Sequence, residues 1–419
     1  MTFTSFSFDR RIVDGIKACN YETPTPIQTQ AIPQVLAGHD VMGLAQTGTG
    51  KTAAFALPIL QRLLGSRPTK NAPSVLILAP TRELALQIND NFKALGKQTG
   101  MTSSVVIGGV GMNPQIKAFS RSRIIVACPG RLVRLINRGA VRLNAISTLV
   151  LDEADRMLDM GFMPDIKRII AQLPVKRQNL LFSATMPSDI RKLADKILVN
   201  PKTVQVARIA PVESVSHKFY KTQTNKKVGL LEKLLAKSEH ESVLIFTRTK
   251  HKAKNLSRKL SNSGYDSTFL QGNMSQSQRQ RALNGFREGT FNIMVATDIA
   301  ARGIDCDRIT HVINFDMPDT VETYTHRIGR TGRAGRTGNA VSLVTLDDKM
   351  HIHSVERVMR IKMEQCTMEG FEQTDEAPRQ KRASRPQASG KRRFNSNSNS
   401  NSNSNSRKRR PSRRRRATA

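Results

Sequence analysis

Residues 45–52 read Ala45-Gln46-Thr47-Gly48-Thr49-Gly50-Lys51-Thr52 and lie between two apolar runs, residues 41–44 and 53–57. This order predicts a strand, a glycine-rich turn and a helix. The backbone N–H groups of such a turn can point at phosphate oxygens, and the N-terminal end of the following helix adds positive potential. We expect Lys51 to reach the β- and γ-phosphates of a nucleotide and Thr52 to hold Mg²⁺.

Such loops usually begin with glycine, and here Ala45 takes that position. Alanine is acceptable there if φ is negative, because only a positive φ requires glycine. The alternative is a glycine-rich turn that binds nothing. The register of Gly48, Gly50, Lys51 and Thr52 between a strand and a helix favours a nucleoside triphosphate site.

The chain of 419 residues carries a formal net charge of +34. Residues 377–419 contain 15 Lys or Arg and no Asp or Glu, which leaves +19 for residues 1–376. Both parts are therefore basic, and we expect a polyanionic partner, above all nucleic acid. Solubility alone would not need so large an imbalance.

Composition also limits the location of the protein. No run approaches 18 apolar residues, which argues against a transmembrane helix and a membrane partner, and residues 1–5 lack the features of a signal peptide. The four cysteines are far apart and form no metal-ligand pair; they are Cys19, Cys128, Cys306 and Cys366. We expect a cytoplasmic protein with free thiols.

Apolar runs of strand length alternate with helix-length segments along most of the chain. The predicted strands after the loop are residues 75–78, 104–107, 123–126, 148–151 and 179–182, and then 243–246, 268–270, 292–295, 311–314 and 341–344. Residues 207–216 interrupt the alternation and are interpreted as a linker. This pattern predicts an α/β fold with parallel sheets, helices on both faces, and ligands beyond the carboxyl ends of the strands.

Two polar motifs complement the loop. A helix is predicted to begin near Pro26, and the amide of Gln28 in its first turn suits the N6/N7 edge of adenine, although a surface glutamine is the ordinary alternative. Asp152-Glu153-Ala154-Asp155 follows a predicted strand. We assign Asp152 to the metal and Glu153 to the attacking water; the alternative is an acidic helix N-terminus that complements the helix dipole.

The second half of the chain has no phosphate loop but carries Arg302-Gly303-Ile304-Asp305 and the arginines of residues 326–333. A helix would place Arg327 and Arg330 on one face, together with residues near Arg333. Converging guanidiniums suit a phosphate better than a core role. They could complete the nucleotide site as arginine fingers, or form a basic helix that faces RNA or solvent; spacing alone does not decide.

The pattern ends near residue 375. Residues 395–406 alternate Asn and Ser between clusters of Lys and Arg, so we expect a disordered tail that holds nucleic acid electrostatically, with nuclear localisation as an alternative.

In their order, these motifs resemble those of the DEAD-box ATP-dependent RNA helicases. The resemblance covers residues 3–344 and rests on residues 21–28, 45–52, 80–85, 108–109, 129–131, 152–155, 183–185, 246–249, 276–279, 296–305 and 326–333. The compact core with a basic low-complexity tail is similar to the bacterial RhlE-type branch.

The resemblance implies two tandem RecA-like domains that bind ATP, Mg²⁺ and RNA. We place them at residues 1–206 and 217–370, joined by the linker 207–216 and followed by the tail 371–419. It also implies these roles: Phe3 (or Phe6), Tyr21, Gln28, Ala45, Gln46, Thr47, Gly48, Thr49, Gly50, Lys51, Thr52 and Asp305 bind the nucleotide; Lys51, Thr52, Asp152, Glu153, Arg330 and Arg333 are catalytic; Thr52 and Asp152 hold Mg²⁺, partly through water; Ser183, Thr185, Asp155 and His326 couple hydrolysis to domain closure; and Arg82, Gly109, Gly130, Arg131, Thr247 and Arg279 contact RNA.

The sequence departs from the family pattern at two positions. Asn20 replaces a common glycine, which asparagine can do in the left-handed region. Cys128 replaces the usual threonine before Pro129 and removes a hydroxyl, so we expect a modestly weaker RNA contact there.

The expected activity is an RNA-dependent ATPase that locally unwinds short RNA duplexes or remodels RNA–protein complexes, by family analogy in ribosome assembly or RNA decay. Mostly backbone contacts imply low sequence specificity. Ribosomal precursors or RNA-decay proteins are the expected further partners, and a monomer the expected state. The alternatives are an RNA chaperone that acts through its tail, with incidental ATPase, and a DNA helicase or translocase.

Overall fold

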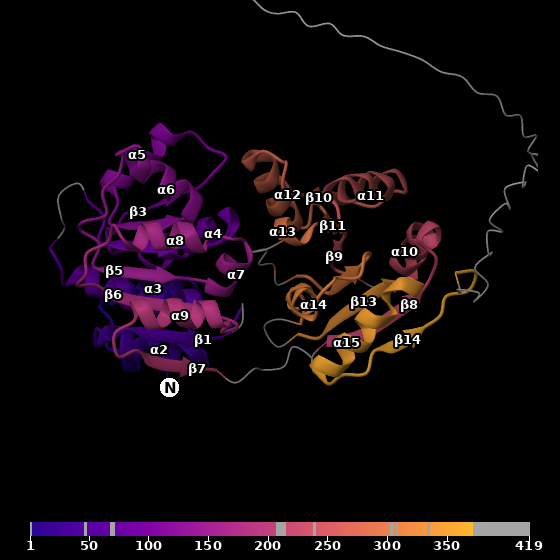
Figure 1. The fold of residues 1–419 in the computed structure, drawn as a ribbon, viewed down its shortest axis with the longest axis horizontal. Coiled ribbons are helices and arrows are strands. Elements are labelled where there is room, and N and C mark those ends of the chain that lie inside the picture. Colours follow the sequence, from indigo (N-terminus) through magenta and orange to yellow (C-terminus); the bar gives the residue numbers. More distant parts are fainter. Residues whose placement is uncertain are drawn as a thin grey trace, which may run out of the picture. The chain divides into compact units, whose positions relative to one another are not determined.

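The computed structural model describes residues 2–371 except 46–47, 68–71, 207–214, 238–239, 302–305, 307, 333–335 and the side chain of Ile299. Residues 1–373 form one compact unit that contains two seven-stranded sheets (Figure 1). Residues 372–419 of the predicted tail lie outside the described residues, whereas Phe371, its first residue, packs against the core of the second domain. None of the helices in the described part of the chain is both long and apolar enough to cross a membrane.

The first sheet has the strand order β3-β4-β2-β5-β6-β1-β7, and all its pairings are parallel. Its strands are β1 (Val41–Leu44), β2 (Val75–Leu78), β3 (Ser103–Val106), β4 (Ile124–Ala127), β5 (Thr148–Leu151), β6 (Gln178–Ser183) and β7 (Lys202–Gln205). The central strands β2, β4, β5 and β6 are buried along their whole length, since both faces are covered, and this explains their continuous apolar runs.

Helices cover the first sheet on both faces. One face packs on α1 (Arg10–Ala18), α2 (Pro26–Leu36), α3 (Lys51–Leu64) and α4 (Arg82–Leu95). The other packs on α5 (Met112–Arg121), α6 (Pro129–Asn137), α7 (Ala154–Asp159), α8 (Met163–Ile170) and α9 (Ser188–Ile197). A short 3₁₀ turn, η1 (Phe3–Phe6), precedes α1.

The second sheet repeats this plan with the order β10-β11-β9-β12-β13-β8-β14, again all parallel. Its strands are β8 (Val215–Lys221), β9 (Val243–Phe246), β10 (Ser267–Leu270), β11 (Ile293–Ala296), β12 (His311–Asn314), β13 (Gly338–Val344) and β14 (Glu364–Cys366). One face packs on α10 (Lys227–Lys237) and α11 (Lys250–Asn262). The other packs on α12 (Gln276–Glu288), α13 (Asp298–Ala301), α14 (Val321–Ile328) and α15 (Lys349–Met359), with η2 (Thr224–Lys226) and η3 (Leu346–Asp348) as short turns.

The predicted fold class is confirmed: both sheets are parallel and have helices on both faces. Three strands were missed, namely β7, β8 and β14. Strand β8 begins at Val215, inside the range interpreted as linker, and residues 207–214 of that range lie outside the described residues. The missed strands lie at or next to a sheet edge, where one face meets water and the apolar pattern is weak.

Candidate nucleotide and RNA site

The phosphate loop connects the end of β1 to the start of α3. Gly48 and Gly50 have φ of 85° and 89°, a conformation that L side chains rarely adopt. The ammonium of Lys51 is buried and donates a hydrogen bond of 2.9 Å to the carbonyl of Ala45. The lysine therefore spans the loop in the conformation described here. Gln46 and Thr47 lie outside the described residues.

Gln28 lies directly against this loop. Its amide nitrogen donates to the carbonyl of Gly50 at 3.1 Å, and its amide oxygen accepts from the N–H of Thr25 at 2.9 Å. A Cβ on Gly50 would lie 2.6 Å from that amide nitrogen, so the close approach itself needs glycine. The helix start at Pro26 is confirmed. The amide is engaged at both ends, and an adenine would have to replace one of these bonds.

Four aromatic rings gather near the start of the chain. Phe3 stacks on Tyr21 with ring centroids 6.3 Å apart and an interplanar angle of 24°. Phe3 also meets Phe6 edge-on, and Phe6 contacts Phe8. Phe3 and Phe6 are both buried, whereas Tyr21 is exposed. Phe3 contacts the exposed ring of Tyr21. The stacking of Phe3, or alternatively of Phe6, on adenine stays a prediction.

Asp152 and Glu153 follow the end of β5. Asp152 is buried, and burial, followed by the charge of Glu153, raises its pKa to about 6 against the opposing effect of Lys51. The N–H of Glu153 donates to the Asp152 carboxylate at 3.0 Å. A buried carboxylate with a raised pKa, close to a lysine at the phosphate loop, favours a bound cation. In the described residues no three His, Cys, Asp or Glu side chains gather into a metal cage. Mg²⁺ usually takes one or two protein carboxylates and completes its shell with phosphates and water, and Asp152 could supply such a carboxylate.

The backbone of Glu153 is unusual. Its φ of 53° and ψ of 53° place a non-glycine residue in the left-handed region, at a cost of about 1 kcal/mol or more. Its carboxylate forms a buried ion pair of 2.8 Å with Arg156. Arg156 was not predicted as a site residue; its spacing of three from Glu153 on a helix start was the available signal.

The predicted coupling residues form one network. The Asp155 carboxylate accepts from the N–H of Thr185 at 2.8 Å, from its hydroxyl at 2.9 Å and from the N–H of Ala184 at 3.2 Å. The N–H of Asp155 donates to the Ser183 hydroxyl at 3.2 Å. The start of α7 is therefore bonded to the end of β6. On α14, burial, with smaller contributions from the charges of Arg156 and Arg330, lowers the pKa of His326 to about 4. The nearby charges of Asp155 and Glu153 oppose this shift.

The arginines at the end of α14 have different roles from one another. The helix ends at Ile328, so Arg330 follows it, and its Nε donates to the carbonyl of His326 at 3.2 Å. Arg327 has a core role, contrary to the inference drawn for the group. Arg327 is buried and pairs with Asp298 at 2.6 and 2.8 Å, and its guanidinium lies 5.0 Å from the centre of the Phe246 ring. Arg333 and Asp305 lie outside the described residues.

Four of the predicted RNA contacts gather in the first half of the chain. Gly109 has a φ of 80°, and a Cβ there would lie only 2.3 Å from the guanidinium of Arg82. Arg131, in the first turn of α6 beside Gly130, donates to the carbonyl of Val110 at 2.8 Å. Burial lowers the pKa of Arg131, and the nearby charges of Arg134 and Arg82 contribute to the same shift. The positive charges of Arg82 and Arg131 therefore lie next to the backbone of Gly109 and Val110.

Cys128 is the N-cap residue of α6 and is buried beneath this cluster. Burial raises its pKa to about 12; the charge of Glu83 adds to the shift, and Arg82 and Arg131 oppose it. The thiol is neutral and makes no side-chain capping bond at the start of α6.

The two RNA contacts predicted in the second half are less open. The Thr247 side chain is fully buried, and its hydroxyl donates a long bond of 3.4 Å to the carbonyl of Thr249. Arg279 is also buried and pairs with Glu83 at 2.6 Å. It donates further to the carbonyls of Gln271 and Ala300 at 3.1 and 3.3 Å. These bonds connect α12 to α4 through Arg279. The contact of Thr247 and Arg279 with RNA stays a prediction.

Two family models match this chain. Residues 25–193 match the DEAD/DEAH box helicase family, and residues 226–335 match the helicase conserved C-terminal domain. The two sheets are therefore the tandem RecA-like domains of a helicase.

Individual relatives define the family more closely. The chain is 39% identical over 382 residues to the DEAD-box ATP-dependent RNA helicase CshA of Bacillus licheniformis, covering 91% of this chain and 78% of the relative. It is 41% identical over 365 residues to CshA of Geobacillus kaustophilus, covering 87% and 78%. The structure of S. cerevisiae Dbp5 bound to RNA and ADP BeF3 is similar with a TM-score of 0.78 and 32% identity, covering 87% of this chain and 95% of that one. The chain belongs to the DEAD-box ATP-dependent RNA helicases, enzymes that use ATP and bind RNA.

Proposed function

We propose that the protein is an RNA-dependent ATPase that separates short RNA duplexes locally or remodels RNA–protein complexes. The observation that carries the proposal is the bonding of Asp155 to Thr185, because it joins the strand end that bears the catalytic carboxylates to the next strand end. The likeness to Dbp5, solved with RNA and ADP BeF3, supports ligands of the same two classes.

At the nucleotide, Lys51 would leave the carbonyl of Ala45 for the β- and γ-phosphates, and Gln28 would orient the adenine. Asp152 and Thr52 fit Mg²⁺, which when bound would neutralise charge on the phosphates. Glu153 is placed to orient a water and accept its proton. Arg156 pairs with Glu153 and fixes its carboxylate, and therefore acts as a positioning residue.

Coupling to RNA would depend on two sets of residues. Ser183, Thr185 and Asp155 transmit the state of the nucleotide, with His326 as their neighbour in the second domain. Arg330, and with it Arg333, would contact the γ-phosphate on closure. ATP can shift the equilibrium from the open to the closed arrangement of the domains only if it binds the closed arrangement more tightly.

RNA would lie along Arg82, Gly109, Gly130 and Arg131, mostly through its backbone, so recognition has little sequence dependence. We retain the first-domain limit 1–206, the monomeric state and the cytoplasmic location as parts of this proposal, and we move the start of the second domain from 217 to Val215, where β8 begins. The RhlE-type assignment is also a proposal, since the relatives above carry the name CshA. Ribosome assembly and RNA decay are its two candidate settings.

The test compares Glu153→Gln with Lys51→Ala. The first should keep ATP and RNA binding but lower RNA-stimulated ATPase at least a hundredfold, since the amide cannot accept the proton of the water and no longer forms the ion pair with Arg156. The second should weaken ATP binding itself. Turnover by Glu153→Gln close to that of the wild type would contradict the assignment of the water-activating residue.

The second candidate is an RNA chaperone that works through its basic tail. The charge of residues 377–419 favours it, since a chain with 15 cations and no carboxylate binds any RNA. Strand annealing that survives Lys51→Ala but disappears when residues 377–419 are removed would select this function.

A further inference from the structure

A groove in the second domain lies away from every residue assigned above. Its volume is about 550 Å³, and it is formed by the end of β8, one side of α15 and the strand β14. In the sheet order, β8 and β14 lie at the opposite edge from β10, β11 and β9, the strands nearest Thr247 and Arg279. The groove is therefore separate from the RNA-contacting part of the domain.

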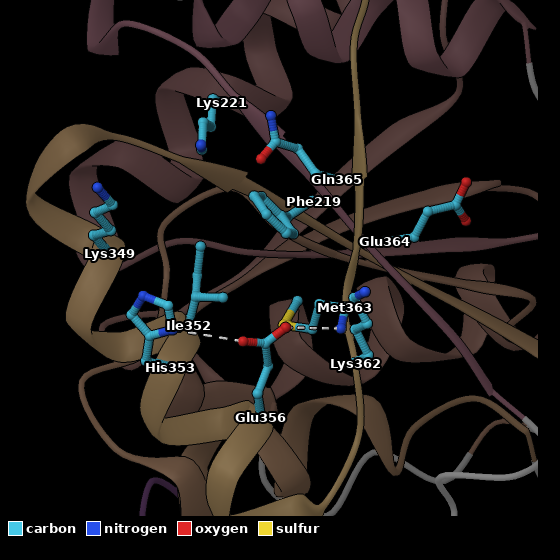
Figure 2. Close-up of a pocket in the computed structure, with 10 residues that line it drawn as sticks. All are labelled: Phe219, Lys221, Lys349, Ile352, His353, Glu356, Lys362, Met363, Glu364 and Gln365. Carbon is cyan, nitrogen blue, oxygen red and sulfur yellow. Dashed lines mark hydrogen bonds and ion pairs between the residues drawn. The ribbon is translucent and has the colours of Figure 1, made fainter.

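The floor of the groove is apolar and fixed. It consists of Phe219, Ile352 and Met363, which are all buried and belong to the same core cluster. Figure 2 shows the Phe219 ring at the centre with the other side chains around it. A floor of this kind accepts an apolar side chain.

The rim is basic, and its cations are not neutralised. Lys221, Lys349 and Lys362 stand at separate points around Phe219 (Figure 2), and within the described residues none forms an ion pair with a carboxylate. Two carboxylates also line the groove, and only Glu364 pairs with a lysine outside it. Glu364 pairs with Lys218 at 3.7 Å and points away from Phe219, while Glu356 accepts the N–H of Met363 at 3.0 Å and lies 3.7 Å from His353.

One wall of the groove is a sheet edge. Among the residues that the structure describes, strand β14 pairs with β8 alone, so its other side presents backbone groups that an extended chain can bond. The side chain of Gln365 on this strand faces the groove, in register with Phe219.

We propose that this groove binds an extended acidic segment of a partner protein, which adds to β14 and places an apolar side chain over Phe219, Ile352 and Met363. The three lysines would pair with its carboxylates. Charge decides against the other occupants from this chain: residues 377–419 hold 15 cations and no anion, and a second copy carries the same +34. RNA is disfavoured because it has no peptide backbone with which to continue the hydrogen bonding of the β14 edge.

The test uses the full chain and a fluorescein-labelled ten-residue peptide, GDEDLFDEDG, measured by anisotropy at 150 mM salt. The triple variant Lys221→Glu, Lys349→Glu, Lys362→Glu should weaken binding at least tenfold. The matched control, Lys192→Glu, Lys196→Glu, Lys202→Glu, makes the same change in net charge on exposed residues of the first domain and should stay within twofold. Equal losses in the two triple variants would overturn the proposal, since attraction would then be non-specific.

Two further measurements locate the peptide and test the apolar floor. A twin peptide with serines in place of Leu and Phe should bind at least fivefold more weakly, and Gln365→Trp, which narrows the groove without changing the core, should weaken the first peptide by a similar factor. A photoreactive version of the peptide should crosslink to residues 349–365, and crosslinks confined to residues 377–419 would overturn the proposal. A ten-nucleotide RNA serves as competitor. If this RNA displaces the peptide and itself binds more weakly to the lysine triple variant, the groove is an RNA site and the proposal is wrong. RNA-stimulated ATPase should be unchanged in all these variants. A loss of ATPase would contradict the separation of the groove from the helicase site.

Discussion

The Thr185 hydroxyl donates a hydrogen bond of 2.9 Å to the same Asp155 oxygen that accepts the Thr185 backbone N–H at 2.8 Å. One carboxylate oxygen at the start of α7 therefore holds both the backbone and the side chain of the segment that follows β6. A movement of α7 on nucleotide binding would pull on this segment directly.

Replacing Thr185 with valine tests this connection. The side chain keeps its shape and loses only the hydroxyl, whose bond to a charged group is worth about 1.5–3 kcal/mol. We expect strand separation per ATP hydrolysed to fall about tenfold, while RNA-stimulated ATPase stays within about threefold. Thr203→Val, an exposed position on β7, is the control. Equal losses of ATPase and unwinding would mean that Thr185 serves the chemistry and not the coupling.

Gly109 and Arg82 give a second prediction. A methyl group at Gly109 would lie 2.3 Å from the Arg82 guanidinium, so Gly109→Ala must displace that side chain. We expect RNA affinity to fall about tenfold, as for the loss of one charge-assisted bond, with ATP binding in the absence of RNA unchanged.

Gly38→Ala separates this effect from backbone strain. Gly38 has a similar φ of 84°, but a Cβ there meets nothing within 4 Å. Both substitutions should destabilise the fold by roughly 1 kcal/mol, through the left-handed backbone alone. Only Gly109→Ala should weaken RNA binding, and equal RNA affinities of the two variants would contradict the placement of Arg82 in the RNA site.

Cys128 allows a gain of function to be tested. The buried thiol at the N-cap of α6 lies among Arg82, Arg131 and Glu83, and its pKa of about 12 keeps it neutral. Cys128→Thr restores a hydroxyl that can cap the helix or bond RNA, so we expect RNA affinity to rise about threefold, the effect of one neutral hydrogen bond. Cys128→Val has the same shape without the hydroxyl and should leave RNA affinity at or below that of the wild type.

The sequence predicted most of this structure because the signals were local. Buried parallel strands produce continuous apolar runs, and the phosphate loop needs Gly48 and Gly50 at positive φ. The strands and the loop can therefore be recognised from short stretches of sequence alone. Edge strands such as β7 and β14 lack that pattern, since only part of each is buried.

The surroundings of the buried arginines could not be predicted, for a different reason. Arg279 and Arg327 look alike in sequence to arginines that bind phosphate, but their partners Glu83 and Asp298 are 196 and 29 residues away. No spacing rule identifies such a pair, because burial and an ion pair are set by the packing of distant elements. The acidic partner, and not the arginine, decides the role.

The last prediction concerns pH and His217. This residue on β8 is buried, its Nδ1 lies 3.0 Å from the Tyr324 hydroxyl, and its Nε2 has no hydrogen-bond partner among the described residues. Burial lowers its pKa from 6.5 to about 4. The unfolded chain therefore binds more protons than the folded chain between these values, so stability falls as the pH drops from 6.5 toward 4. The loss attributable to His217 is about 3 kcal/mol at the acid end.

His217→Gln should remove that share of the pH dependence, since an amide can still bond Tyr324 but does not titrate. The free energy of unfolding, taken from urea titrations between pH 7.5 and 4.5, should fall less steeply in this variant than in the wild type. His353→Gln, at an exposed histidine on α15, should keep the wild-type slope. His326, whose pKa is also lowered to about 4, would supply part of the slope that remains in His217→Gln. An unchanged slope in His217→Gln would show that the buried His217 imidazole does not govern acid sensitivity.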